Sequence, residues 1–334
     1  MRNDTRVKYH AYLQQLASLS GVPSAVEKFT VSPTTQQRLE TRMQESSAFL
    51  QSINMIGVQE MAGSKVGIGV SGTIAGRTNT ATTDRAPRDV GALDEFGYVC
   101  KQTNFDTKVS YAQLDAWAKF PDFQTRLASA ILRQQALDRI MIGFNGTSAA
   151  ATTDRVANPL LQDVNIGWLK HIEVDAPDQV LTGGAAAGHV TYGPGGDYEN
   201  LDALVFDAIQ MLAPWHRENP DIRVIASRDL MHDKYFPLVN NVTDPTEMLA
   251  ADMVISQKRM GGLQAMGVPF FPAGTILITA PRNLSIYWQE GARRRAVQDN
   301  PKRDCIENYE SSNDAYVVED YQMVAVVKNI EKAA

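Results

Sequence analysis

The stretch PDFQTRLASAILRQQALDRIMIG, residues 121–143, predicts the long helix on which the rest of the fold depends. Pro121 suits the first turn of a helix, where its missing N–H costs nothing, and we expect Gly143 and Gly146 to end the helix. At about 1.5 Å per residue, such a helix is about 33 Å long. Two rows of residues predict that it is covered on two faces: Phe123, Leu127, Ala130, Leu137, Met141 and Phe144 in an apolar row, and Ala128, Leu132 and Ala136 in a row of small residues opposite. The alternative is an ordinary core helix of an α/β enzyme.

Length and charge narrow the classes of protein. A chain of 334 residues with 44% hydrophobic content can fill one large core or two modest ones, so we expect two domains. The formal net charge is −6 and no dense run of Lys or Arg occurs, which argues against binding nucleic acid through a basic face. DNA as a partner is expected to be weakly repelled.

Cysteine usage and hydropathy indicate the setting. Cys100 and Cys305 lie far apart, with no CxxC or Cys/His spacing, so the sequence predicts neither a zinc site nor a disulfide framework. A reducing cytoplasm is the simplest setting. No uninterrupted apolar run follows the N-terminal basic residues or reaches the length of a membrane span, so neither a signal peptide nor membrane insertion is expected.

Residues 1–29 behave as a separate unit. Tyr9, Tyr12, Leu16 and Leu19 line one side of a predicted helix, and Gly21 and Pro23 break the pattern after it. Such a segment cannot bury its apolar side alone, so we expect it to dock on the body, on a neighbour or on a partner. A simple N-terminal cap helix is the alternative.

The most unusual composition lies between residues 63 and 105. Residues 65–74 alternate β-branched residues with Gly and Ser, residues 75–87 are rich in Thr, Gly, Ala and Arg, and extended residues resume at Tyr98. Two strands around a long polar excursion predict a protruding hairpin that needs a neighbour to rest on. Residues 67–72 also match GxGxxG, but a poor helix former follows them, whereas a dinucleotide site requires a helix there.

The second half of the chain predicts a β/α block over residues 197–285. We expect helices over 198–212 and 228–239, the latter stopped by Pro237. Strands are expected at IRVIAS (222–227), VPFFP (268–272), TILITA (275–280) and LSIYWQ (284–289). The tail adds at least two strands and ends in an apolar one, which we expect to share a pair of layers with the long helix.

No arrangement of residues predicts catalysis. The five histidines are scattered, GxSxG and Walker motifs are absent, and Glu319 and Asp320 are expected to point to opposite faces of a strand. We therefore predict no catalytic, cofactor-binding or metal-binding residue. Arg293, Arg294 and Arg295 could hold phosphate, but in an acidic protein we favour contacts with acids of an adjoining subunit.

Several long segments, in order along the chain, closely resemble the major capsid protein of P2-like tailed bacteriophages. The resemblance covers almost the full length and departs at about residues 76–93 and 183–188. The segments are MQESSAFLQSIN (43–54), VGIGVSGTIA (66–75), MIGFNG (141–146), NPLLQDVNIGWL (158–169), GGDYENLDAL (195–204), DKYFPLVN (233–240), EMLAADMVISQKRMGGLQA (247–265) and NPKRDCIENYESSNDAYVVEDY (300–321).

The resemblance implies an α+β, HK97-like capsid fold. The helix at 121–143 resembles the spine helix of that fold. The implied parts are a prosegment (1–29), an N-terminal arm (30–62), an extended loop (63–105), a peripheral domain (106–196, returning at 286–334) and an axial domain (197–285).

The implied function is a structural one. Pentamers and hexamers of the chain are expected to form the icosahedral shell around the double-stranded DNA of a tailed phage, in the virion, after assembly in the bacterial cytoplasm. The implied partners are other copies of the chain, an internal scaffold and protease, the portal protein and the packaged DNA, which is bound without sequence specificity. No cofactor and no membrane are implied. An encapsulin-like nanocompartment shell is the nearest alternative, and a nucleotide-dependent enzyme a remote one.

The resemblance also implies particular residues. KFTVSP aligns with the family's maturation site, which predicts cleavage between Phe29 and Thr30. Contacts between subunits are expected from arginines of the extended loop and of the tail: Arg77, Arg85, Arg88, Arg293, Arg294 and Arg295.

Overall fold

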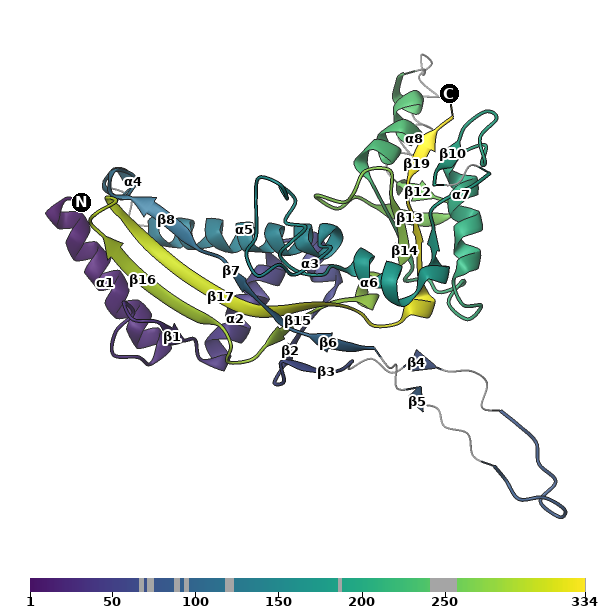
Figure 1. Cartoon of the computed structure of the whole chain (residues 1–334), viewed down its shortest axis with the longest axis horizontal. Helices are drawn as coiled ribbons and strands as arrows, with labels where there is room; N and C mark the ends of the chain where they lie inside the picture. The colour runs from purple at the N-terminus through teal and green to yellow at the C-terminus, as the bar shows by residue number, and fades with distance from the viewer. Residues whose placement is uncertain are drawn as a thin grey trace.

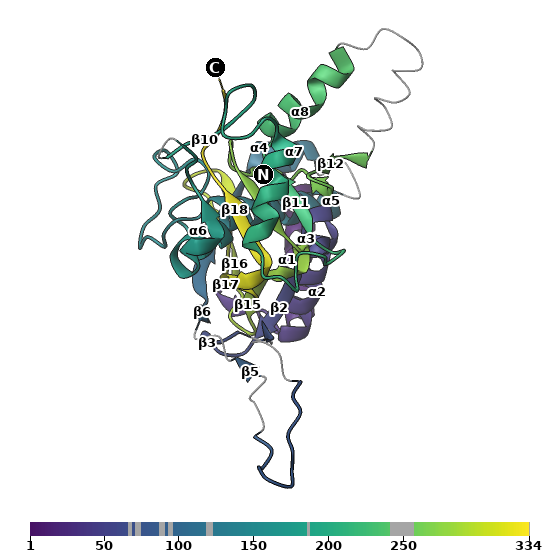
Figure 2. The same cartoon turned by 90° about the vertical axis from the view of Figure 1, so that its right-hand side faces the viewer.

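The computed structural model shows two lobes and a long arm (Figure 1). It describes residues 1–65, 69–70, 75–86, 91–92, 96–117, 123–185, 188–240 and 257–333. An elongated lobe carries the N-terminus at its far end, and an upright lobe carries the C-terminus at its top. The arm leaves the junction of the two lobes and points away from both (Figures 1 and 2).

A seven-stranded sheet forms the floor of the elongated lobe, and its longest strand is β17. The strand order is β1-β16-β17-β15-β2, with β7 and β8 also paired to β17, and β15 with β2 is the parallel pair. The strands are β1 (Phe29–Thr30), β2 (Asn54–Val58), β7 (Lys101–Asn104), β8 (Thr107–Ser110), β15 (Leu284–Gln289), β16 (Arg294–Asn300) and β17 (Cys305–Val318).

The helices of this lobe pack around one long helix, α5. Buried residues of α2, α3, α5 and α6 form one apolar core with strands of both large sheets. The helices are α1 (Asn3–Ser20), α2 (Pro33–Glu45), α3 (Ala48–Ser52), α4 (Tyr111–Trp117), α5 (Phe123–Asn145) and α6 (Trp168–Asp175), followed by the short η1 (Pro177–Gln179).

The predicted long helix is confirmed, but its burial was predicted only in part. The C-terminal half is buried, including Ile140, Ile142 and Phe144, whereas Ala128 and Ala130 are exposed, so the first half is not covered on two faces. The helix also continues through Gly143 to Asn145. A Cβ on Gly143 would lie 2.3 Å from the Trp168 ring, so this glycine allows α6 to pack closely against α5 instead of ending the helix.

A six-stranded sheet is the centre of the upright lobe, in the order β12-β13-β11-β14-β18-β9. Its strands are β9 (Val180–Leu181), β11 (Arg223–Ala226), β12 (Arg259–Met260), β13 (Leu263–Met266), β14 (Ile276–Thr279) and β18 (Val324–Val327). Helices α7 (Leu201–Ala208), η2 (Ile209–Met211) and α8 (Arg228–Asn240) belong to the same lobe, with the pair β10 (Val190–Tyr192) and β19 (Ile330–Lys332).

Three expectations for this lobe were wrong. Pro237 lies inside α8 and does not stop it, and residues 268–272 form no strand. The strand that precedes β14 in the sequence is instead β13, which pairs parallel to β11. The third, on the tail, was wrong only in part: β18 pairs with β14 in the six-stranded sheet, but its Val324 and Val326 still pack in one core with α5.

The chain crosses between the lobes more often than the predicted block boundaries suggest. Strand β15, at the end of the block predicted over 197–285, lies in the seven-stranded sheet, while β9, β10, β18 and β19 belong to the upright lobe. The short helices η3 (Pro281–Asn283) and η4 (Tyr321–Met323) lie at these crossings. The two lobes are therefore joined by several crossings of the chain rather than by one linker.

Candidate functional site

The arm is a β-hairpin, as the sequence predicted. Strand β3 (Ala62–Ser64) pairs antiparallel with β6 (Gly97–Val99), and farther out β4 (Gly69–Val70) pairs with β5 (Gly91–Ala92). Residues 75–86, the described part of the tip, are all exposed. The hairpin extends well beyond the body in both views (Figures 1 and 2).

The same geometry bears on the GxGxxG match at 67–72. Gly69 and Val70 lie in a strand, and residues 75–86 contain no helix; the match's other residues lie outside the described part of the chain. A dinucleotide fingerprint needs a helix directly after the glycines, whose N-terminal amides hold the pyrophosphate. In the described residues, this stretch instead serves the hairpin.

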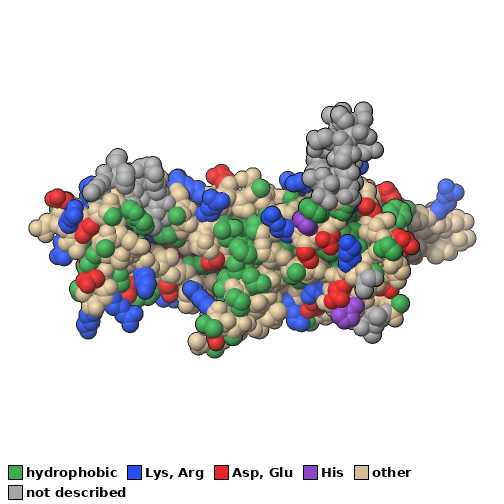
Figure 3. Space-filling model, turned by 90° about the horizontal axis from the view of Figure 1, so that it is seen from above, with side chains coloured by type: hydrophobic (Ala, Val, Ile, Leu, Met, Phe, Trp, Pro, Cys, Tyr) green, Lys and Arg blue, Asp and Glu red, His purple; other side chains and the backbone are tan. Residues whose placement is uncertain are grey.

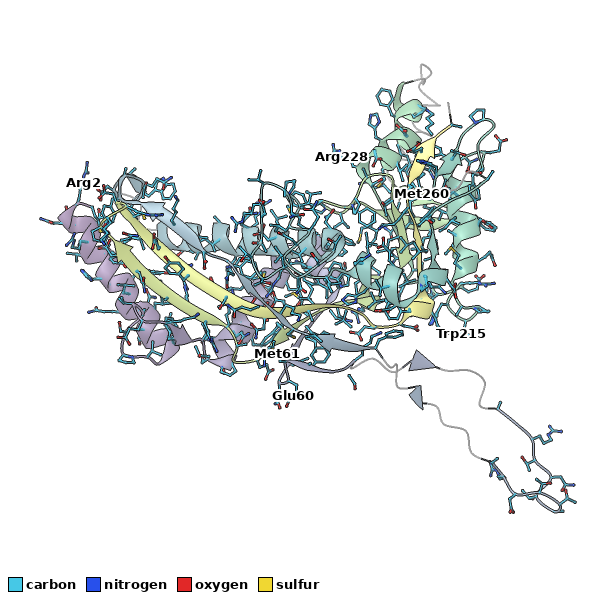
Figure 4. All side chains as sticks on the ribbon, in the orientation of Figure 1. Arg2, Glu60, Met61, Trp215, Arg228 and Met260 are labelled. Atoms are coloured by element: carbon cyan, nitrogen blue, oxygen red, sulfur yellow. The ribbon has the colours of Figure 1, made fainter. Side chains whose placement is uncertain are left out.

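A small apolar cluster anchors the base of the hairpin to the body. Tyr98 and Cys100 are buried beside Tyr287 of β15, and the two tyrosine rings meet edge to face with centroids 4.9 Å apart. Burial raises the pKa of the Cys100 thiol to about 12, so this thiol stays protonated and inert at neutral pH. Figure 4 shows Glu60 and Met61 at this base, and Met61 is half exposed.

The N-terminal segment docks on the far end of the elongated lobe. Tyr9 of α1 is buried against Leu114, Val297 and Ile306, and the backbone N–H of Arg2 donates to Asp115 at 2.9 Å. The expectation that the segment docks on the body is met in this structure. Its predicted apolar side is only partly correct, because Leu19 is 66% exposed.

The predicted cleavage position lies in the edge strand β1. Phe29 pairs with Arg295 and Thr30 with Arg294, and the Phe29 side chain is buried in a cluster with Ala25 and Val31. A protease binds its substrate as an extended segment that is not paired with another strand of the substrate. The strand must therefore leave β16 before this peptide bond can be cut.

Three consecutive arginines follow β15 and lie in three different environments. Arg294 is exposed, and Arg295 is half-buried and donates to Asn308 at 2.8 Å and to the Tyr12 hydroxyl at 3.0 Å. Arg293 is 1% exposed, and its partners Glu40 and Glu310 belong to the same chain. The structure thus places Arg293 inside its own subunit, where its ion pairs are with acids of the same chain.

Of the three arginines predicted to make contacts from the hairpin, the structure describes two. Arg77 and Arg85 are exposed on the hairpin, where a neighbour could be reached. Arg88 lies outside the described residues. Intersubunit contacts by Arg77, Arg85, Arg88, Arg294 and Arg295 stay predictions.

Arg293 is part of a buried charge cluster that the sequence did not reveal. We use this name for Glu40 of α2, Arg139 of α5, Arg293, and Glu310 and Asp314 of β17. Arg139 contacts both Glu40 and Asp314, the latter at 3.0 Å, while Arg293 lies 2.7 Å from Glu40 and 2.6 Å from Glu310. All five side chains are at most 7% exposed. The cluster therefore ties the N-terminal arm, the long helix and the sheet together.

The protonation states follow from the arrangement. Burial opposes ionisation of Glu40, but Arg139 and Arg293 outweigh it and hold the pKa of that carboxyl below its usual value. The same balance, with Arg293 and Arg295 as the cations, lowers the pKa of Glu310. Burial dominates at Asp314 and raises its pKa, even though Arg139 lies beside it. The cluster thus favours the charged form of both glutamates, whereas burial favours the protonated form of Asp314 relative to a free aspartate.

The histidines do not gather into a catalytic set among the described residues. Four of them each lie beside a single carboxylate: His216 is 3.0 Å from Asp320, His189 is 3.3 Å from Glu331, His171 is 3.4 Å from Asp175 and His232 is 3.7 Å from Asp233. Glu319 and Asp320 follow β17 rather than lying within it, and Glu319 accepts a hydrogen bond from the Tyr287 hydroxyl. In the part of the chain that the structure describes, no group of three or more His, Cys, Asp or Glu side chains could hold a metal ion, and no helix is long and apolar enough to cross a membrane.

Solved structures are similar to this chain over most of its length. The capsid of an empty GTA particle aligns over 86% of this chain and 90% of its own with a TM-score of 0.52 at 17% identity. The cyanophage A-1(L) capsid aligns over 84% and 91% with a TM-score of 0.53 at 13% identity. These likenesses show the fold, which is the HK97-like fold of phage capsid proteins.

Sequence similarity shows the particular family. The family model of the phage major capsid protein, P2 family, matches residues 8–330. The "Capsid proteins" of Escherichia phage P2 are 49% identical over 99% of this chain and 96% of their own length, and the major capsid protein of Serratia phage KSP20 is 44% identical over 99% and 97%. The chain belongs to the P2 family of phage major capsid proteins. The predicted resemblance is thereby confirmed, and the encapsulin alternative is not favoured.

A solved relative carries the same three-dimensional structure. A chain of the satellite phage P4 procapsid that includes the size determination (Sid) protein aligns over 100% of this chain and 99% of its own, with a TM-score of 0.84 and 46% identity. Membership of a capsid family makes self-assembly into a shell, in the virion, the role of this chain. A structural family of this kind also argues against an enzyme.

Proposed function

We propose that the chain forms pentamers and hexamers in an icosahedral shell around the double-stranded DNA of a tailed phage, assembled in the bacterial cytoplasm. The observation that carries this proposal is the hairpin at 63–105, whose described tip is fully exposed and extends beyond the body of its own subunit. A tip whose described residues, 75–86, are all exposed on their own chain is stabilised when it lies on a neighbour.

The physical logic of such a shell follows from head-to-tail contacts. Heterologous contacts close into rings of five or six when the rotation between subunits allows it. One sequence serves both rings if the contact bends at a few points while the body stays rigid. Each contact can be weak, because a subunit held by several neighbours at once gains avidity that no single interface supplies.

Charge supports enclosure of DNA without sequence-specific binding. The net charge of the chain is −6, and on the face shown in Figure 3 Lys and Arg side chains are interspersed with Asp and Glu among the coloured residues, without a continuous basic surface. A wall of this kind does not hold DNA through its phosphates. Packaged DNA then stays free to leave the shell.

We also propose that residues 1–29 are a prosegment removed between Phe29 and Thr30 by a phage protease. Support comes from the docking of α1 on the tip of the elongated lobe and from the edge position of β1, which separates from β16 without disturbing the rest of the sheet. An internal scaffold and a portal protein are the other expected partners.

Two measurements test the proposal. Electron microscopy of the chain expressed with its scaffold and protease is expected to show closed shells with five-fold and six-fold rings, in which the hairpin of each subunit lies on a neighbour. Mass spectrometry of mature particles is expected to find Thr30 as the first residue. Particles that retain Met1 refute the cleavage, and hairpins folded onto their own subunits refute the assembly role.

A further inference from the structure

Three side chains meet where the hairpin leaves the body. Lys65 directly follows β3, Phe96 directly precedes β6, and Tyr321 lies in η4 on the crossing between the lobes. The Lys65 ammonium lies 4.1 Å from the centre of the Tyr321 ring and 5.3 Å from that of Phe96, and the two rings meet edge to face with centroids 5.3 Å apart. Both arms of the hairpin thus contact the same tyrosine.

Tyr321 is itself held from the opposite side. Its hydroxyl donates to Asp175 at 2.5 Å at the end of α6, and Asp175 also lies 3.4 Å from His171. The ring packs against the main apolar core of the elongated lobe. Tyr321 is therefore a fixed point of the body, against which the two arms of the hairpin can be oriented.

We propose that Lys65, Phe96 and Tyr321 form a clasp that fixes the direction in which the hairpin leaves the subunit and so orients it for a second copy of this chain. The part about a second copy rests on the proposed shell function. The first part is a property of the single subunit. Among the described residues of the hairpin, these contacts are the outermost that join both strands to the body, so a small change of angle there moves the tip by a large distance.

The chemistry suits an adjustable joint. A cation over an aromatic face is attracted electrostatically, without the fixed geometry of a hydrogen bond, and at a partly exposed site the attraction is modest. Phe96 is 37% exposed, so the clasp is only partly shielded from water. Such a contact biases the direction of the hairpin yet yields when subunits in five-fold and six-fold rings need different angles. Orienting the hairpin in advance lowers the entropy cost of binding the neighbour.

The test uses the full-length chain, diluted so that it is unassembled. Hydrogen exchange is measured at β3 and β6, and spin labels at Ala75→Cys and Glu290→Cys report the distance between hairpin and body; both native cysteines are buried. Lys65→Met removes the cation, Lys65→Arg keeps it, and Tyr321→Leu removes the ring. Lys101→Met, an exposed lysine of β7, is the matched control.

Loss of the clasp has a defined signature. Lys65→Met and Tyr321→Leu are expected to speed exchange in β3 and β6 about fivefold and to broaden the distance distribution, whereas Lys65→Arg and Lys101→Met match the parent. Unchanged exchange and distances in both Lys65→Met and Tyr321→Leu overturn the clasp. If the clasp behaves as expected but Lys65→Met assembles at the same protein concentration as the parent, the clasp stands and its role in assembly is overturned.

Discussion

The buried charge cluster and the hairpin differ in how far their side chains are exposed to solvent. The cluster brings five charged side chains from distant parts of the chain into a site where none is more than 7% exposed. The hairpin places residues 75–86 where all are exposed. The charges of the cluster are paired within the subunit, whereas the side chains of the hairpin tip are exposed and available to contact a neighbour.

This difference divides the work of a shell protein. Identical subunits in unequal surroundings need a body that keeps its shape and a contact that adapts. Buried ion pairs with complete hydrogen bonding tolerate few alternative arrangements, because each unpaired buried charge is costly. The cluster thus fixes α2, the long helix and the seven-stranded sheet relative to one another, and the hairpin provides the variation.

The largest expected effect comes from breaking the cluster at its centre. Arg139→Met leaves Glu40 and Asp314 facing each other without their shared cation, so we expect it to destabilise the subunit by about 3–5 kcal/mol in urea unfolding. Arg133→Met, an exposed arginine on the same helix, is expected to change the unfolding free energy by less than about 0.5 kcal/mol. Equal effects of the two substitutions would show that the cluster holds nothing together.

Shortening the hairpin tests the opposite side of the comparison. Replacing residues 75–86 with a short Gly-Ser turn removes only exposed residues, so the unfolding free energy is expected to stay unchanged. The concentration needed for shell assembly is expected to rise about a hundredfold, because each subunit loses one of several simultaneous contacts. Light scattering measures this rise. Normal assembly with a loss of stability would reverse the roles assigned to the two regions.

Lowering the pH is expected to destabilise the cluster but not the hairpin, because the cluster contains glutamates whose pKa is shifted by folding. The folded state lowers the pKa of Glu40 and Glu310 below the ordinary 4.5, so their contribution to stability is present above that value and is lost as pH falls through the folded pKa. Asp314 acts in the other direction, because its raised pKa favours the folded state as it takes up a proton.

Protonation of the two glutamates lowers the stability, and protonation of the one aspartate raises it. We expect the glutamates to dominate, so that the unfolding free energy falls between about pH 5 and pH 3. Urea unfolding across this range measures the slope. Glu310→Gln should make it shallower, while the hairpin deletion leaves it as in the parent. A slope that Glu310→Gln leaves unchanged means that other carboxylates cause the acid loss.

Local sequence patterns predicted several elements of the fold. The apolar row of 121–143 predicted α5, and the polar excursion between extended segments predicted the hairpin, because both depend on neighbours in sequence. The long blocks shared with P2-like capsid proteins supplied the rest of the architecture. Pro237 was misleading, because a proline usually kinks or ends a helix, whereas α8 continues past Pro237 to Asn240.

The cluster could not be found in this way. Glu40, Arg139 and Asp314 lie about a hundred or more positions apart, and nothing in a helical period distinguishes a buried arginine from a solvated one. Arg139 belongs to neither of the two rows predicted for α5, yet it is fully buried. Crossing strands such as β15 and β18 escaped for the same reason, since sheet membership depends on distant partners.

The smallest expected effect separates two adjacent arginines. Successive residues of an extended segment point to opposite faces, so Arg293 enters the cluster while Arg294 faces solvent at the start of β16. Arg294→Ala is expected to change the unfolding free energy by less than about 0.5 kcal/mol, and Arg293→Ala by several times more. Urea unfolding of both variants measures the difference. Since Arg294 pairs with Thr30 across the predicted cleavage position, Arg294→Ala is also the variant in which an assembly defect can be observed without loss of the fold. Strong destabilisation by Arg294→Ala would mean that the boundary between the buried and the exposed charges lies one residue farther along the chain.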